Sequence, residues 1–167
     1  RICTEKRSIL DIGGRLRIDR KKNNRYDASR EWLKPLLAGV EYRVLDKVSD
    51  YHPDIVGDIH ALPFLDNSQE AIICIAVLEH VEDPDRVIAE ASRVLAPGGL
   101  FVFHTFNRTW QANLVVIKGV AWFVRNAPTD LHVLRLFVTP DEVRTMCRAH
   151  CLDPIVIRGS RPRFRWP

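Results

Sequence analysis

Short apolar runs alternate with longer polar or amphipathic stretches along most of this chain. Apolar runs bounded by turn residues predict buried β-strands. Such runs occur at residues 9–12, 42–45, 55–56, 71–77 and 100–105, with a further one at 154–158. The run at 71–77 is continuously apolar, which is typical of a central strand that is buried on both faces.

Amphipathic spacing predicts helices between these strands. Residues 83–95 begin with an Asp-Pro pair, place their apolar side chains on one face, and end at Pro97-Gly98-Gly99. Residues 29–38 also have helical spacing, which Pro35 shortens or kinks. A capping box at 139–142 opens a helix to about residue 150. Strands that alternate with helices predict a mostly parallel sheet, with ligands at the carboxyl ends of the strands.

Length and composition predict one globular domain over residues 1–167, because 46% of the residues are hydrophobic and 28% are charged. The chain begins at Arg1 rather than Met, which leaves open that the domain is incomplete at its N- or C-terminus. The cysteines form no Cys-x-x-Cys pair, and a reducing cytoplasm is the simplest compartment. The basic stretch 15–25 has no interleaved aromatic residues, so we expect no nucleic-acid partner.

Four motifs occur in a fixed order along the first two-thirds of the chain: Asp11-Ile12-Gly13-Gly14, Gly57-Asp58-Ile59, Leu78-Glu79-His80-Val81 and Pro97-Gly98-Gly99. Their order and spacing resemble the class I S-adenosylmethionine (SAM)-dependent methyltransferases, of the methyltransferase type 11 group. The resemblance implies a Rossmann-like α/β fold, with a mostly parallel sheet in the order 3-2-1-4-5 and helices on both faces. It also implies a sixth strand near 154–158. Only residues 159–167 remain for the family's strand seven, which we expect to be short or absent.

The resemblance implies a SAM site at the ends of the first strands. Glycines without a Cβ atom allow backbone to approach a ligand, and a carboxylate after strand two can accept hydrogen bonds from both ribose hydroxyls. The residues expected to bind the cofactor are Asp11, Gly13, Gly14, Asp46, Asp58 and Ile59. The alternative is that Asp46 and Asp58 are ordinary turn carboxylates. Arg15 stands where the family has its last glycine, so the sequence does not predict how the methionine end of the cofactor would be bound.

The C-terminal half resembles the ubiquinone-biosynthesis O-methyltransferases. The matching residues are Asn107, Pro128, His132, Phe137, Thr139 and Pro140. This implies methyl transfer to an oxygen of a small or prenylated aromatic acceptor. His80 is the candidate base, because its unperturbed pKa is about 6.5, and Glu79 could orient it or bind a cation. The alternative is that Glu79 and His80 only cap the strand. Ala76 replaces an acidic residue of that family, so Mg²⁺ is doubtful and no metal ligand is assigned.

Residues 110–126 predict an apolar helix with a narrow polar stripe formed by Gln111, Lys118 and Arg125. This helix is too short and too charged to span a bilayer, but it could lie in a membrane interface and admit a lipid acceptor. The protein would then be cytoplasmic and peripheral on the inner face of a membrane. A lid over the active site and a homo-oligomer interface are the alternatives.

Two other functions fit the same residues. The first half is equally similar to methyltransferases of polar metabolites or glycan precursors. Arg15 and Ala76 also allow a non-catalytic SAM-binding relative. Cofactor binding separates the enzymes from that relative, and lipid binding separates the two kinds of enzyme.

Overall fold

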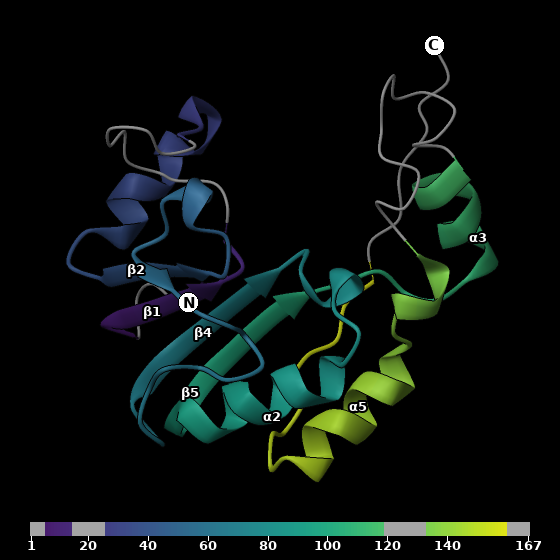
Figure 1. Cartoon of the computed structure of the whole chain (residues 1–167). Helices are drawn as coiled ribbons and strands as arrows, with labels where there is room; N and C mark the ends of the chain where they lie inside the picture. Colours follow the sequence, from purple (N-terminus) through teal and green to yellow (C-terminus); the bar gives the residue numbers. More distant parts are fainter. Residues whose placement is uncertain (1–5, 15–25, 119–132, 160–167) are drawn as a thin grey trace.

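Five parallel strands form a single sheet in the order β3-β2-β1-β4-β5 in this computed structural model, which describes residues 6–14, 26–118 and 133–159 (Figure 1). The strands are β1 (Ser8–Ile12), β2 (Glu41–Asp46), β3 (Ile55–Val56), β4 (Gln69–Ile75) and β5 (Leu95–His104). Every neighbouring pair is parallel. The predicted strand order is therefore confirmed.

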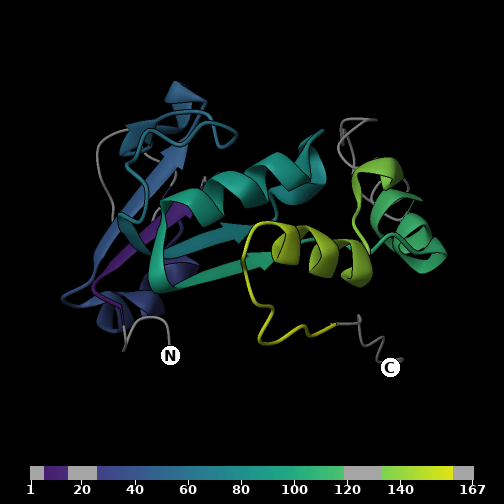
Figure 2. The same ribbon diagram turned by 90° about the horizontal axis from the view of Figure 1, so that it is seen from below.

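Helices lie on both faces of the sheet, as predicted. Their bounds are η1 (Ala28–Leu37), η2 (Ser49–Tyr51), η3 (Leu78–His80), α2 (Pro84–Val94), α3 (Trp110–Ala112), η4 (Asn113–Lys118), η5 (Leu134–Leu136) and α5 (Pro140–Ala149). Figure 2 shows α2 on one face of the sheet and η1 on the other. The Asp83 side chain caps α2, and Thr139 forms the expected capping box with Glu142 at the start of α5.

The core lies between the sheet and α2. Leu10, Ile72 and Cys74 project from the strands against Val87 and Ala91 of the helix, and all five side chains are buried. A second buried cluster joins α2 to α5, which packs beside it. The fully buried residues therefore fix α2, and with it the turn that precedes this helix at the end of β4.

The role predicted for Pro97-Gly98-Gly99 at the end of the α2 helix is corrected. The helix stops at Val94, and Pro97-Gly98-Gly99 lies within β5, where the register with β4 shifts. Gly98 has a φ of +72°, and a Cβ atom on Gly99 would lie only 2.7 Å from the carbonyl oxygen of Ala96. The Pro-Gly-Gly sequence therefore makes a tight bend inside the strand and does not act as a helix stop.

The predicted sixth strand is wrong. Residues 152–159 have no regular secondary structure, and Ile155 and Val156 are exposed. A strand needs a neighbour for its hydrogen-bond ladder, and among the described residues no strand pairs with β5 on its side away from β4. Residues 160–167, where strand seven was expected to be short or absent, lie outside the described residues.

The described part of the helix predicted at 110–126, residues 110–118, differs in kind from the expectation. It begins as α3 and continues as η4, a π-helix with i→i+5 hydrogen bonds, up to Lys118. The angular spacing expected for the polar stripe of an α-helix is therefore not kept. Trp110, Leu114 and Val115 are exposed, and α3 with η4 stands away from the sheet in Figures 1 and 2. Trp122 and Arg125 lie outside the described residues.

Candidate functional site

The turn after β1 requires both of its glycines. Gly13 has a φ of +74° and donates its N–H to the carbonyl of Leu45 at 2.7 Å. A Cβ atom there would lie 2.6 Å from the Val77 side chain, and one on Gly14 would lie 2.5 Å from the Asp11 carboxylate. The predicted glycine turn is thus a position where the backbone passes close to its surroundings.

Asp11 supports this turn from inside the sheet. Its carboxylate accepts a hydrogen bond from the hydroxyl of Tyr42 on β2 and packs against Gly14. The side chain is half-buried, so its place is between the strands and the turn. Asp11 therefore has a structural role in this structure, beside the cofactor role that the sequence implied.

Asp46 ends β2 and is buried, with 7% of its surface exposed. Its Oδ1 accepts the N–H of Val48 at 2.8 Å, and its carbonyl accepts the N–H of Gly57 at 3.1 Å. The carboxylate is therefore held at a fixed place at the end of the strand. Each carboxylate oxygen can accept two hydrogen bonds, so acceptor capacity remains for a ligand.

Asp58 follows β3 and is exposed. Its Oδ1 accepts the backbone N–H of His60 at 2.8 Å and lies 2.8 Å from Nδ1 of the same residue. The backbone hydrogen bond, followed by that from the His60 ring, lowers the pKa of Asp58. Ile59 packs against the main core cluster. Because β1, β2 and β3 are neighbouring parallel strands, the predicted cofactor residues all lie at or just beyond the carboxyl ends of these three strands.

Glu79 and His80 occupy η3, directly beyond the end of β4. Glu79 is fully buried, and neither of its carboxylate oxygens makes a hydrogen bond of good geometry, although its own backbone N–H and the Thr105 hydroxyl lie close enough to act on its pKa. Burial raises its pKa, and its own backbone N–H, His104 and Thr105 offset this only in part. The His80 side chain is exposed. The structure therefore gives no hydrogen bond by which Glu79 could orient His80.

Two further features mark this end of β4. Ala76 has a φ of +56°, in the left-handed region that a residue with a Cβ atom rarely adopts, and its N–H donates to the carbonyl of His104 at 3.2 Å. The hydroxyl of Thr105, which follows β5, is buried near the Glu79 carboxyl and makes no hydrogen bond of good geometry. Within residues 6–14, 26–118 and 133–159, no three His, Cys, Asp or Glu side chains gather as metal ligands would.

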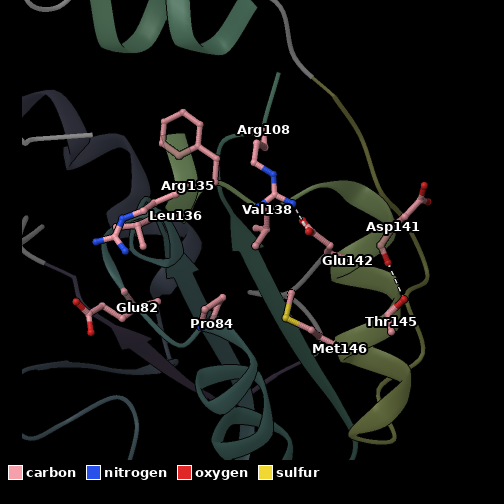
Figure 3. A pocket seen from close by; sticks show the side chains of 12 residues that line it. Glu82, Pro84, Arg108, Arg135, Leu136, Val138, Asp141, Glu142, Thr145 and Met146 are labelled. Carbon is pink, nitrogen blue, oxygen red and sulfur yellow. Dashed lines mark hydrogen bonds and ion pairs between the residues drawn. The ribbon is translucent and has the colours of Figure 1, made fainter. Parts of the chain in front are cut away.

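An open pocket of about 510 Å³ lies between the η3–α2 junction, η5 and α5 (Figure 3). Val81, which follows His80 directly, lines it together with Pro84, Leu136 and Met146. Arg108 and Arg135 stand at its rim, and Arg108 forms an ion pair with Glu142. The pocket volume suits a small molecule.

Two residues that support the site, Tyr42 and Arg93, lie outside the set predicted from the sequence. Tyr42 could have been found, because in a parallel pair of strands Asp11 lies opposite Val44, and Tyr42 projects from the same face two residues away. Arg93 of α2 donates to backbone carbonyls of the loop after β3. No sequence pattern indicates which carbonyl oxygens a side chain will reach.

Known proteins that are similar to this chain are methyltransferases. A family described as "Methyltransferase domain" matches residues 26–103. The chain is 35% identical over 92 residues to the ubiquinone biosynthesis O-methyltransferase of Paracidovorax citrulli, covering 55% of this chain and 39% of that protein. The corresponding protein of Methylococcus capsulatus is 36% identical over 90 residues, covering 54% and 38%. The matched region thus spans about two-fifths of these relatives.

Solved structures show the same fold. A methyltransferase solved in complex with the Haloferax volcanii Trm112 activator has a TM-score of 0.53 at 19% identity, covering 87% of this chain and 60% of that one. A SAM-dependent methyltransferase of Thermotoga maritima has a TM-score of 0.53 at 18% identity, covering 86% and 62%. These likenesses show that the chain has the class I methyltransferase fold, and the family match at residues 26–103 lies within it.

Proposed function

We propose that this chain is a SAM-dependent methyltransferase that transfers a methyl group to an oxygen of a small or prenylated aromatic acceptor. The observation that carries the proposal is the gathering of the glycine turn, Asp46 and Asp58 at neighbouring strand ends. The names of the relatives support an oxygen acceptor. Because the match spans only part of those relatives, the activity of the whole protein is itself part of the proposal.

The residues present fit SAM by their chemistry. Asp46 is a fixed carboxylate with free acceptor capacity, which suits the ribose hydroxyls. Asp58 and Ile59 would hold the adenine, and the turn at Gly13 and Gly14 would let the backbone approach the rest of the molecule. When bound, SAM supplies a methyl group that its sulfonium already activates. The protein therefore needs mainly to align the acceptor.

His80 is the proposed base on the acceptor side. Its exposed side chain at the end of β4 can take the proton from an acceptor hydroxyl as the methyl group is transferred. The pocket that begins at Val81 would receive the apolar part of the acceptor. We propose that Glu79, which is fully buried in η3, supports this turn from beneath, and its burial raises its pKa.

Two measurements test this function. Calorimetry with S-adenosylhomocysteine asks whether the chain binds the cofactor product. Transfer of labelled methyl groups from SAM to catechols, with and without a prenyl chain, asks what it methylates. Binding without any transfer would favour the non-catalytic relative, and transfer only to polar metabolites or glycan precursors would favour the other enzyme. Absence of S-adenosylhomocysteine binding would contradict all three.

We also propose that residues 110–126 make a peripheral contact with the inner face of a membrane, from the cytoplasm. The exposed Trp110, Leu114 and Val115 of α3 and η4 support this, because exposed apolar side chains grouped on one element mark an interaction site. None of the helices in the described parts of the chain combines the length and apolar character needed to cross a membrane. Flotation with anionic and with neutral vesicles tests the contact.

A lipid contact predicts binding that needs anionic lipid and weakens as salt rises. Replacing both Lys118 and Arg125 by Glu should then release the protein from vesicles without unfolding it. If no binding occurs at low salt, sedimentation of the free protein decides between the remaining alternatives. A dimer would favour the homo-oligomer interface, and a monomer would favour the lid.

A further inference from the structure

We propose that Arg93 and Glu90 of α2 are positioning residues that hold the loop 57–66 in the shape that presents Asp58 and Ile59 to the cofactor. The inference rests on the proposed SAM site, because it concerns the loop that would hold the adenine. It assigns a role to two residues that neither touch the proposed ligand nor belong to any of the sequence motifs.

Arg93 uses every donor that its side chain has. A guanidinium carries five N–H groups, and here each makes one hydrogen bond. They go to Glu90 Oε1 at 3.0 Å, Glu90 Oε2 at 2.8 Å, Asp66 Oδ1 at 2.6 Å, and the carbonyls of Leu62 and Phe64, both at 3.0 Å. Three of the five acceptors belong to the loop, so the side chain binds that loop in one conformation.

Glu90 completes the contact from the other direction. Its Oε2 accepts the N–H of Leu62 at 2.9 Å, so Leu62 is held through both its N–H and its carbonyl. The hydrogen bond from Arg93 is the main cause of the lowered pKa of Glu90. The Glu90 side chain is only 20% exposed, which keeps this pair more shielded from water than an ordinary surface pair.

The loop has little regular secondary structure, although Leu62 is buried in the core and Ile59 and Phe64 pack against it. Between β3 and β4 it contains a single isolated bridge, from Asp58 to Ala61. Arg86 adds one more contact, donating Nε–H to the carbonyl of His60 at 3.1 Å. Arg86, Glu90 and Arg93 fall at i, i+4 and i+7, so one polar face of α2 holds the backbone of the loop.

The geometry also explains why arginine stands at this position. A lysine would keep the positive charge, but it has three donors on one atom and cannot form the paired bonds to a carboxylate. Arg93→Lys therefore removes the paired hydrogen bonds to Glu90 while keeping the positive charge. Arg144 is the matched control, since it also pairs with an acidic residue three positions earlier, at 2.6 Å, but on α5 and away from the loop.

The test measures binding and local opening in the same set of variants. Calorimetry gives the affinities for S-adenosylhomocysteine and for adenosine, and hydrogen exchange reports the amides of residues 57–66. Arg93→Lys should speed exchange in the loop. If it leaves the loop in its binding shape about a tenth of the time, both affinities should fall about tenfold, because apparent affinity scales with the competent fraction.

Arg144→Lys should change neither measurement. Val143→Ala, which removes buried apolar contacts of α5, provides a variant destabilised elsewhere and should leave the affinities unchanged at a temperature where it is folded. The inference is wrong if Arg93→Lys binds S-adenosylhomocysteine as the wild type does, or if Val143→Ala loses as much affinity. A wild type that does not bind S-adenosylhomocysteine contradicts the proposed function instead, and this outcome is visible before any variant is made.

Discussion

The two halves of the sheet's carboxyl edge differ in how their polar groups are satisfied. At the ends of β1, β2 and β3, each carboxylate of the proposed cofactor site accepts a hydrogen bond from the protein. The donors are the Tyr42 hydroxyl for Asp11, the Val48 N–H for Asp46 and the His60 N–H for Asp58. This half is a fixed scaffold.

At the ends of β4 and β5 the opposite holds. The Glu79 carboxyl and the Thr105 hydroxyl are buried near each other without a hydrogen bond of good geometry, and Ala76 occupies the left-handed region. Buried unsatisfied groups and unfavourable backbone angles each destabilise a fold, and proteins keep them mainly where chemistry occurs. The two halves therefore differ in their buried polar groups and not in backbone angles, since His52, which follows β2 in the cofactor half, has a φ of +49°.

The largest expected effect separates chemistry from binding. His80→Ala should lower the turnover number by about 10²–10⁴-fold, as loss of a general base does. The affinity for S-adenosylhomocysteine should stay the same, because the contribution of His80 belongs to the transition state. Steady-state kinetics together with calorimetry checks this. Full turnover in the variant would show that His80 is not the base and that Glu79 and His80 only cap the strand.

The next effect concerns the cofactor half. Asp46→Ala should weaken binding of S-adenosylhomocysteine by about 1.5–3 kcal/mol, since a charged hydrogen-bond acceptor for the ribose is lost. Glu41, at the other end of β2, is exposed and provides the control, so Glu41→Ala should bind as the wild type does. Equal affinities for the two variants would show that Asp46 is not the ribose ligand.

Glu79→Gln tests whether the buried Glu79 carboxyl makes the stability of the protein depend on pH. Because burial raises the pKa of Glu79 in the folded protein, the unfolded chain loses this proton first as pH rises. The free energy of unfolding therefore falls as the pH rises above about 4.3, by at most about 1.4 kcal/mol per pH unit. The fall ends once the carboxyl of the folded protein ionises too.

The variant lacks this titration. Its stability relative to the wild type should therefore increase with pH, as measured by urea unfolding between pH 5 and 8. Glu82→Gln, at an exposed neighbouring position, is the variant measured for comparison. Two parallel stability curves for Glu79→Gln and the wild type would mean that the carboxyl is solvated in solution.

The smallest expected effect concerns Ala76. Glycine adopts a φ of +56° without strain, so Ala76→Gly should stabilise the fold by a net amount of about 0.5–1 kcal/mol. The same change at Ala89, inside α2, should instead destabilise the fold by about 1 kcal/mol. Thermal unfolding of the two variants distinguishes them, and a loss of stability at both positions would remove the evidence for strain at the end of β4.

Local signals and motif order predicted much of the fold. The caps at Asp83 and Thr139 involve side chains within three residues of the backbone that they bind, so the sequence is sufficient to place them. The sheet order followed from the resemblance, and the cofactor residues met at one edge because neighbouring parallel strands end together. The predicted strand at 154–158 failed because apolar composition cannot supply a pairing partner.

The direction in which each side chain points could not be predicted from the sequence. Glu79 and His80 are adjacent in the chain, yet one side chain is buried and the other is exposed. Arg93 reaches acceptors up to 31 positions away, and only the folded loop brings their carbonyls within its range. The burial of Glu79 and the hydrogen bonds from Arg93 to the loop 57–66 thus depend on contacts between distant segments, which no local pattern encodes.

The strand order has a consequence for how the chain is made. β1 comes first among the described strands, yet it lies in the middle of the sheet, where Leu10 pairs with Ile72 of β4. During synthesis from the N-terminus, β1, β2 and β3 emerge with one edge of β1 open until β4 follows. An open strand edge pairs readily with other chains, and pairing between distant segments is slow. Until β4 emerges, the nascent chain is therefore exposed to association with its neighbours on the ribosome.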